Sequence, residues 1–156
     1  MNLDNTVDLL WILICAILVF LMQAGFMCLE AGCTRNKNNI NTALKNICDF
    51  GICMLAFWAC GYGLMFGNSL SGFVGTSDFL FLSKSPQAGA WFIFQAGFCG
   101  AALTIVSGAV AERLKFSMYL VISTVGAIFL YPLVGHWIWN DSGWLSQLGF
   151  IDFAGS

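Results

Sequence analysis

Long uninterrupted apolar runs dominate the chain. Four runs contain no Asp, Glu, Lys or Arg, and they lie at residues 9–29, 50–66, 89–111 and 116–139. A helix needs about 20 residues to cross the hydrocarbon core of a bilayer. The runs are apolar on all sides and carry no polar stripe at the 3.6-residue period, which is typical of helices surrounded by lipid.

This pattern predicts an all-α integral membrane protein with one membrane domain over residues 1–156. The expected spans take in the residues that flank each run and lie at about 8–31, 43–66, 89–111 and 116–139. The apolar residues after 149 predict the start of a fifth span at about residue 150, of which too few residues follow to cross a membrane.

Composition supports a membrane solvent and excludes several classes of function. Only 9% of the residues are charged and 59% are hydrophobic, whereas a soluble domain carries roughly 25% charged residues. A net charge of -2 provides no basic face, so we expect no nucleic-acid partner. The seven cysteines form no C-x-x-C pair and one histidine is present. We therefore expect free cysteines and no metal site.

The basic residues predict the orientation of the chain. Five of the six flank the first and second short connections, and these are Arg35, Lys37, Lys45, Arg113 and Lys115; Lys84 lies on the other side. The positive-inside bias places these connections in the cytoplasm and the N-terminus outside. The long connection 67–88 is then external, and the apolar stretch 79–82 predicts that it lies back on the helices.

Ionisable side chains are costly in lipid, so each one is expected to have a structural or functional role. Glu30 and Asp49 fall near the cytoplasmic ends of their helices, where we expect them to cap or to pair, Glu30 with Arg35 and Asp49 with Lys45. His136 is expected to be a helix-packing residue with satisfied hydrogen bonds rather than a proton carrier or metal ligand.

Aromatic residues supply the candidate binding groups. Phe94 and Phe98 share one face of the third span and offer either a gate that meets a cation with its ring faces or ordinary packing. Trp139 ends the fourth span, where it is either part of an aromatic belt or a recruitment site for a cation. Asp152 is either an N-cap of the next helix or a group that holds a cation at the outer mouth.

Taken together, the motifs resemble the ammonium transporter, methylammonium permease and Rhesus family. They occur in order along nearly the whole chain: Gln23–Phe26, Leu29–Gly32, Arg35–Asn38, Gly61–Gly63, Phe66–Gly67, Phe94–Phe98, Ala111–Ser117, Tyr131–Pro132, His136–Trp139, Leu148–Gly149 and Asp152–Gly155.

The resemblance implies an eleven-helix fold, usually trimeric, with one narrow apolar pore per subunit. This chain would supply helices 1 to 4 and the start of helix 5. By the same resemblance, Phe94 and Phe98 form the stacked pair that closes the outer end of the pore, and Trp139 recruits ammonium. Asp152 orders the recruitment region without contacting the ion. The paired pore histidines of the family and the hydroxyl partner of the recruitment site lie beyond Ser156.

The implied function is transport of ammonium or ammonia, with methylammonium as an analogue, and it implies neither enzymatic activity nor a cofactor. The alternatives are an ammonium sensor, in which this membrane domain is fused to a cytoplasmic signalling domain, and an unrelated helix bundle. Implied partners are the lipid bilayer, two further copies in a homotrimer in the plasma or inner membrane, and a cytoplasmic PII-type regulator or the fused domain.

Overall fold

The computed structural model describes residues 3–83 and 85–154, so Lys84 and Gly155 of the sequence interpretation lie outside the described residues. Within that part, four helical segments are long and apolar enough to cross a membrane: Asn5–Cys33, Asn36–Phe66, Pro86–Ala109 and Phe116–Gln147. The prediction of an all-α protein with four spans is confirmed. Residues 150–154, the described part of the expected fifth span, are irregular.

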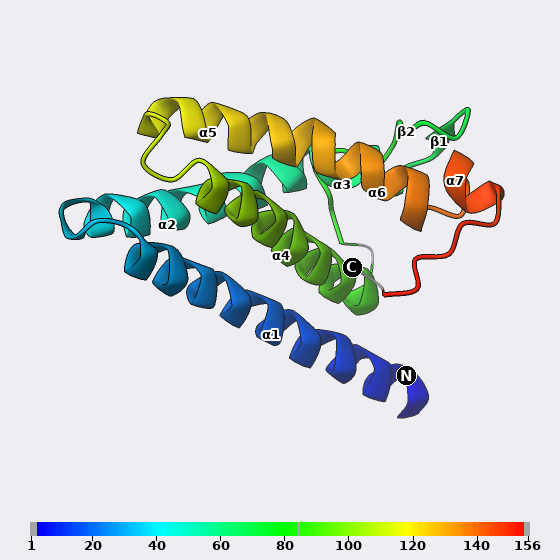
Figure 1. Cartoon of the computed structure of the whole chain (residues 1–156). Helices are drawn as coiled ribbons and strands as arrows, with labels where there is room; N and C mark the ends of the chain where they lie inside the picture. Colours follow the sequence, from blue (N-terminus) through cyan, green and yellow to red (C-terminus); the bar gives the residue numbers. More distant parts are fainter. Residues whose placement is uncertain (1–2, 84, 155–156) are drawn as a thin grey trace.

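The first and third spans are uninterrupted α-helices that pack against each other (Figure 1). They are α1 (Leu3–Cys33) and α4 (Pro86–Ala109). The sequence fixes the start of α4, because the Ser85 side chain accepts a hydrogen bond from the Ala88 amide and Pro86 occupies the first turn. A Cβ atom at Gly97 would lie 2.9 Å from the Val19 side chain, so glycine allows α1 and α4 to approach closely here.

The second and fourth spans each contain a π-helical turn at mid-length. The second consists of α2 (Asn39–Ala56), η2 (Phe57–Gly61) and α3 (Tyr62–Phe66). The fourth consists of α5 (Phe116–Val125), η3 (Gly126–Leu130) and α6 (Tyr131–Trp139). The two π turns contact each other. A Cβ at Gly61 would lie 2.6 Å from the Ala127 carbonyl oxygen, so glycine is required at this crossing.

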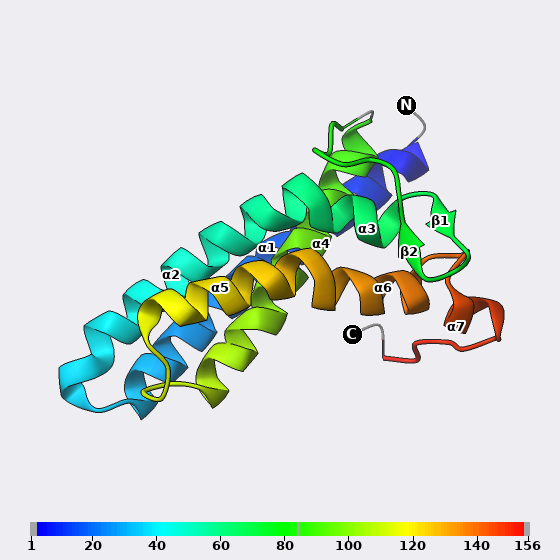
Figure 2. The same ribbon diagram turned by 90° about the horizontal axis from the view of Figure 1, so that it is seen from above.

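The connections separate cleanly to the two ends of the bundle (Figures 1 and 2). One end holds the short turn η1 (Asn36–Asn38) and residues 110–115. The opposite end holds a small antiparallel hairpin, β1 (Ser69–Leu70) and β2 (Val74–Gly75), and the short helix α7 (Trp144–Gln147). The Trp144 amide donates to the Gly72 carbonyl oxygen, which joins the hairpin to α7.

The long connection after the second span lies back on the helices, as its apolar residues predict. The Phe81 ring lies 4.4 Å from Tyr62 and 4.8 Å from Phe92, measured between ring centroids. The Trp58 indole donates to the Phe81 carbonyl oxygen at 2.9 Å. These contacts hold the connection against the second and third spans.

Two layers of buried polar side chains join α1, α2 and α4. In the first layer, Gln23 Nε2 donates to Thr104 Oγ1, and Thr104 donates to Asp49 Oδ2 at 3.3 Å. In the second layer, Asn46 Nδ2 and Ser107 Oγ both donate to Glu30 Oε2, at 2.9 and 3.0 Å. Hydrogen bonds of this kind hold helices together in lipid, where the apolar surface supplies little driving force.

The expected pairing of Glu30 with Arg35 is wrong. Arg35 Nε instead forms an ion pair with Glu112 Oε2 at 3.0 Å, and Glu112 Oε1 accepts from Asn38 Nδ2 at 2.7 Å. Arg35 pairs with Glu112 rather than with Glu30. The second short connection places the Glu112 carboxylate, 77 residues after Arg35, at the same end of the bundle. Hydrogen bonds from Asn38, and then from Arg35, lower the pKa of Glu112 to about 2.

Lys45 does not form the expected ion pair with Asp49. The Lys45 ammonium lies over the Tyr119 ring, 4.5 Å from its centroid, and interacts with Asp49 and Glu30 only electrostatically. Asp49 is fully buried and accepts hydrogen bonds from Thr104 and from the Cys53 thiol. Neutral donors therefore take the place of the lysine around this carboxylate.

Candidate functional site

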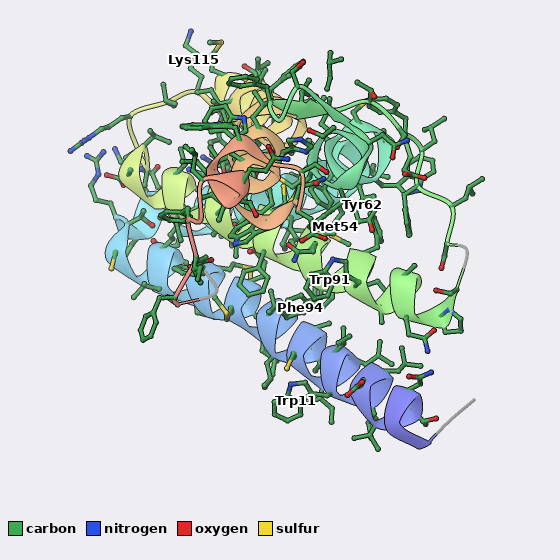
Figure 3. All side chains as sticks on the ribbon, turned by 90° about the vertical axis from the view of Figure 1, so that its right-hand side faces the viewer. Trp11, Met54, Tyr62, Trp91, Phe94 and Lys115 are labelled. Carbon is green, nitrogen blue, oxygen red and sulfur yellow. The ribbon has the colours of Figure 1, made fainter. Side chains whose placement is uncertain are left out.

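The Phe94 and Phe98 side chains lie on α4, four residues apart and therefore on one face of the helix. Their ring centroids are 4.9 Å apart and the ring planes meet at 78°, so the pair is edge-to-face rather than stacked as the resemblance implied. Trp91 extends the pair by one turn, with its ring 5.6 Å from Phe94 (Figure 3). Edge-to-face packing is a favourable arrangement for two rings.

The Trp139 side chain is held in place by Asp152. Trp139 is the last residue of α6, and its indole Nε1 donates to Asp152 Oδ2 at 2.8 Å. The indole ring also contacts Tyr131, with 6.1 Å between the ring centroids. The hydrogen bond fixes the rotation of the indole, so one ring face is presented in a defined direction. The Asp152 carboxylate supports the indole from the irregular segment 150–154.

A continuous series of ring contacts connects the two groups, although no ring contact joins Trp139 directly to the Phe94–Phe98 pair among the described residues. The series passes through Phe98, Phe94, Trp91, Phe66, Tyr62, Phe57, Tyr131 and Trp139. The rings come from η2, α3, α4 and α6, so the packing of the second, third and fourth spans sets their relative positions. Ring faces carry negative partial charge and attract cations.

His136 is a buried residue with both ring nitrogens satisfied. Nδ1 lies 2.8 Å from the Met65 carbonyl oxygen and Nε2 lies 2.9 Å from Ser69 Oγ. Because a carbonyl can only accept, Nδ1 donates to Met65, and Nε2 shares a hydrogen bond with the Ser69 hydroxyl. The geometry corresponds to the packing role expected from the sequence. His136 anchors the β1–β2 hairpin one turn before Trp139.

A polar hollow lies at the same end as Trp139. Its volume is about 610 Å³, and it is lined by residues of the hairpin and of the connection after α6, among them Asn68, Ser71, Asn140, Asp141 and Gln147. The Asn140 amide donates to the Met65 and Gly67 carbonyl oxygens and so holds this connection against α3. The hollow offers carboxylate and amide oxygens to a hydrated cation that approaches the aromatic groups.

Sequence reasoning missed the polar layer around Glu30. The partners Asn46 and Ser107 lie 16 and 77 residues away from Glu30, and spacing along the chain carries no information about such pairs. A signal was available, because polar residues recur at helical spacing on these spans, Asn46 with Asp49 and Thr104 with Ser107. The prediction that Glu30 caps or pairs at a helix end overlooked them.

Comparison with known proteins identifies the family. The model of the Ammonium Transporter Family matches residues 10–156. The ammonium transporter Amt2 of Archaeoglobus fulgidus is 45% identical over 99% of this chain and 36% of its own length. A solved structure described as a sensor Amt protein superimposes with a TM-score of 0.91 at 39% identity, over 96% of this chain and 40% of that chain.

More distant structures show the same fold. Mep2 of Saccharomyces cerevisiae superimposes with a TM-score of 0.78 at 22% identity, over 95% of this chain and 35% of that chain. The chain spans about a third of the length of the curated relatives that it matches. The relatives are transporters rather than enzymes, which confirms the expectation of no enzymatic activity. The chain therefore belongs to the Ammonium Transporter Family and is an N-terminal portion of its multi-pass membrane fold.

Proposed function

We propose that the protein to which this chain belongs moves ammonium or ammonia across a membrane, and that Trp139, Phe98 and Phe94 bind the ion on its way. The observation that carries this proposal is the hydrogen bond from Trp139 Nε1 to Asp152, which fixes an indole at the outer end of an aromatic series that terminates on Phe98. Family membership supplies the substrate class.

An apolar passage lined by aromatic rings can distinguish ammonium from potassium. Ammonium resembles potassium in size and charge, so size alone discriminates poorly between the two ions. Ammonium can transfer a proton to an acceptor, such as water at the outer end, and continue as neutral ammonia through a dry passage. Potassium cannot, and it would bear the full cost of losing its water there. In this scheme, ring faces at the outer end attract the cation, and the Phe94–Phe98 pair admits it only without its water.

Methylammonium uptake by liposomes that contain the full-length protein tests the proposal. Replacement of Trp139 or Phe98 by alanine should lower uptake at subsaturating substrate by about tenfold, because a desolvated cation–π contact contributes about 1–2 kcal/mol. Trp11→Ala is the matched control, since Trp11 is 67% exposed on the outer surface of α1 and lies away from the bundle (Figure 3). Unchanged uptake in both variants would indicate that Trp139 and Phe98 contribute only to packing.

The proposed orientation places the N-terminus outside. The end of the bundle that holds η1 and residues 110–115 also carries Arg35, Lys37, Arg113 and Lys115, as the positive-inside bias requires of a cytoplasmic face. In Figure 3 the Lys115 side chain projects outward from this end. Homotrimer formation and binding of a PII-type regulator belong to the same proposal, with cross-linking of the full-length protein in membranes as their test.

An ammonium sensor is the second candidate, and the TM-score of 0.91 with a structure described as a sensor Amt protein favours it. In that case the same outer residues would bind ammonium, and a fused cytoplasmic domain would read the occupancy. The two functions differ in one measurement. Liposomes with the full-length protein accumulate methylammonium if it is a transporter, whereas a sensor binds ammonium without accumulation.

A further inference from the structure

The Glu30 carboxylate lies on a surface that continues from the proposed Phe gate. Positions 94, 98, 101, 105 and 108 of α4 follow the alternating three- and four-residue spacing of one helix face. Gly108, the last of them, faces Glu30: a Cβ atom there would lie 3.4 Å from Glu30 Oε1. At 1.5 Å per residue, Glu30 therefore lies about 15 Å from Phe98 along α4, toward the proposed cytoplasmic end.

Glu30 is buried yet reaches a hollow at that end. The side chain belongs to a residue that is 7% exposed. The hollow has a volume of about 330 Å³ and is formed by the last turns of α1 and α4 together with Cys33, Thr34 and Glu112. A carboxylate at the base of such a hollow can meet a small ligand from the cytoplasmic side while it remains shielded from bulk water.

The polar groups around Glu30 include more hydrogen-bond acceptors than donors. Among the described residues, both hydrogen bonds to Glu30 fall on Oε2, which leaves Oε1 beside Gly108. The amide oxygen of Asn46 is buried and finds no partner in the described part of the chain. Asn46 is 1% exposed, and its Nδ2 is the atom that binds Glu30. Buried acceptors without partners are costly, so the cluster lacks a donor.

The formal charges of the buried side chains also favour a positively charged ligand beside Glu30. Glu30 and Asp49 carry two formal negative charges, and Lys45 carries one positive charge. Lys45 lies over the Tyr119 ring and forms no ion pair within 4 Å with either carboxylate in the described residues. The cluster thus has a formal charge of -1, and buried charge in a membrane protein is normally compensated.

We propose that Glu30, positioned by Asn46 and Ser107, forms a second binding site for a small monovalent cation, at the inner end of the passage, and that ammonium occupies it during transport. Ammonium supplies both missing features, because it carries one positive charge and four N–H donors. The inference rests on the proposed function for the identity of the cation. Ammonia that crosses the dry passage and takes a proton from the solvent on the cytoplasmic side would be held here as ammonium before release.

Calorimetric titration of ammonium chloride into the detergent-purified full-length protein tests the inner site, with choline chloride to hold ionic strength constant. The Trp139→Ala background removes the proposed outer site. In that background we expect one remaining binding event. Adding Glu30→Gln should weaken it by tenfold or more, since the amide keeps the shape of the side chain and loses its charge.

Two further variants separate binding from folding. Asp8→Asn in the same background removes an exposed carboxylate at the opposite end of α1, and it should leave the binding event unchanged. Glu30→Asp keeps the charge and should retain measurable binding. Absence of any binding in the Trp139→Ala protein, or equal binding with and without Glu30→Gln, would overturn the inner site.

The inner site and the proposed transport can fail separately. Wild-type protein that carries no methylammonium into liposomes but retains Glu30-dependent binding would overturn transport alone. Protein that transports methylammonium with the expected dependence on Trp139, but shows no Glu30-dependent binding, would overturn the inner site alone.

Discussion

Single side chains set the direction of the groups on which the proposed function depends. The Trp139 indole is fixed by one hydrogen bond to Asp152, and the Glu30 carboxylate is fixed by two from Asn46 and Ser107. In both cases a carboxylate accepts from a neutral donor. Hydrogen bonds to a charged acceptor are stronger than those between two neutral groups.

Replacement of Asp152 by leucine should therefore impair recruitment without touching the ring itself. The indole N–H loses its acceptor, at a cost of about 1.5–3 kcal/mol, and the ring is free to rotate. We expect the half-saturating methylammonium concentration in liposome uptake to rise about fivefold or more. Asp152→Asn keeps an acceptor oxygen and should show a smaller rise. Equal rises in the two variants would argue against the hydrogen bond as the cause.

Glu112 links the two short connections and should make stability depend on pH. Its pKa is lowered from 4.5 to about 2 by Asn38 and Arg35, so the folded state holds the charged form. The stabilisation is fully present above pH 4.5 and is lost as the pH falls through about 2. The melting temperature of Glu112→Gln should lie below that of the wild type from pH 5 to 7, and the two should converge near pH 2. A constant difference across this range would contradict the assignment.

At the scale of elements, the paired π turns are the unusual feature. The turns η2 and η3 lie at mid-length of the second and fourth spans and contact each other through backbone at Gly61 and Ala127. Each π turn inserts one residue into its helix and rotates the faces beyond it. The positions of Tyr131 and Trp139 relative to α5 therefore depend on η3.

Gly61→Ala should destabilise the protein by about 1–3 kcal/mol, because the added methyl group collides with the Ala127 carbonyl oxygen and with the Phe57 ring. Gly51→Ala is the control. Gly51 lies on the exposed side of α2, and no atom is within 4 Å of an added Cβ. A helix gains stability from alanine at such a position. Thermal unfolding in detergent measures both changes, and equal melting temperatures would contradict the predicted collision.

The sequence predicted the spans and their number because an apolar run of 20 residues has few alternatives to a membrane helix. It also indicated the aromatic and acidic candidates. It could not indicate the partner of Arg35, because Glu112 reaches it only after two spans have packed. The π turns were also missed, since Gly61 and Gly126 are compatible with an ordinary helix packed closely against its neighbour. The roles of Trp139, Phe94, Phe98 and Asp152 in ammonium binding remain predictions.

At the scale of the whole molecule, the two ends of the bundle differ in character. The end with the hairpin and α7 is neutral to acidic and carries the polar hollow, whereas the opposite end carries four basic residues, Arg35, Lys37, Arg113 and Lys115. This asymmetry makes the orientation in the membrane a testable property.

Labelling of single cysteines should report the orientation. Cys33 is exposed at the last residue of α1. With Cys33 as the only cysteine in the full-length protein, a membrane-impermeant maleimide should label it only after the membrane is opened. Ser71→Cys in a cysteine-free background places a thiol on the exposed hairpin, and intact cells should be labelled there. The reverse result would place the N-terminus in the cytoplasm.

The two polar layers have a consequence for how the protein enters the membrane during synthesis. The second span carries Asp49, and an ionisable side chain within a lone membrane helix is costly until it finds partners. Its hydrogen-bond partner Thr104 belongs to the third span, and Thr104 in turn accepts from Gln23 of the first span. The nascent first and second helices should therefore remain beside the translocon until the third emerges, and the three should pass into lipid as a group.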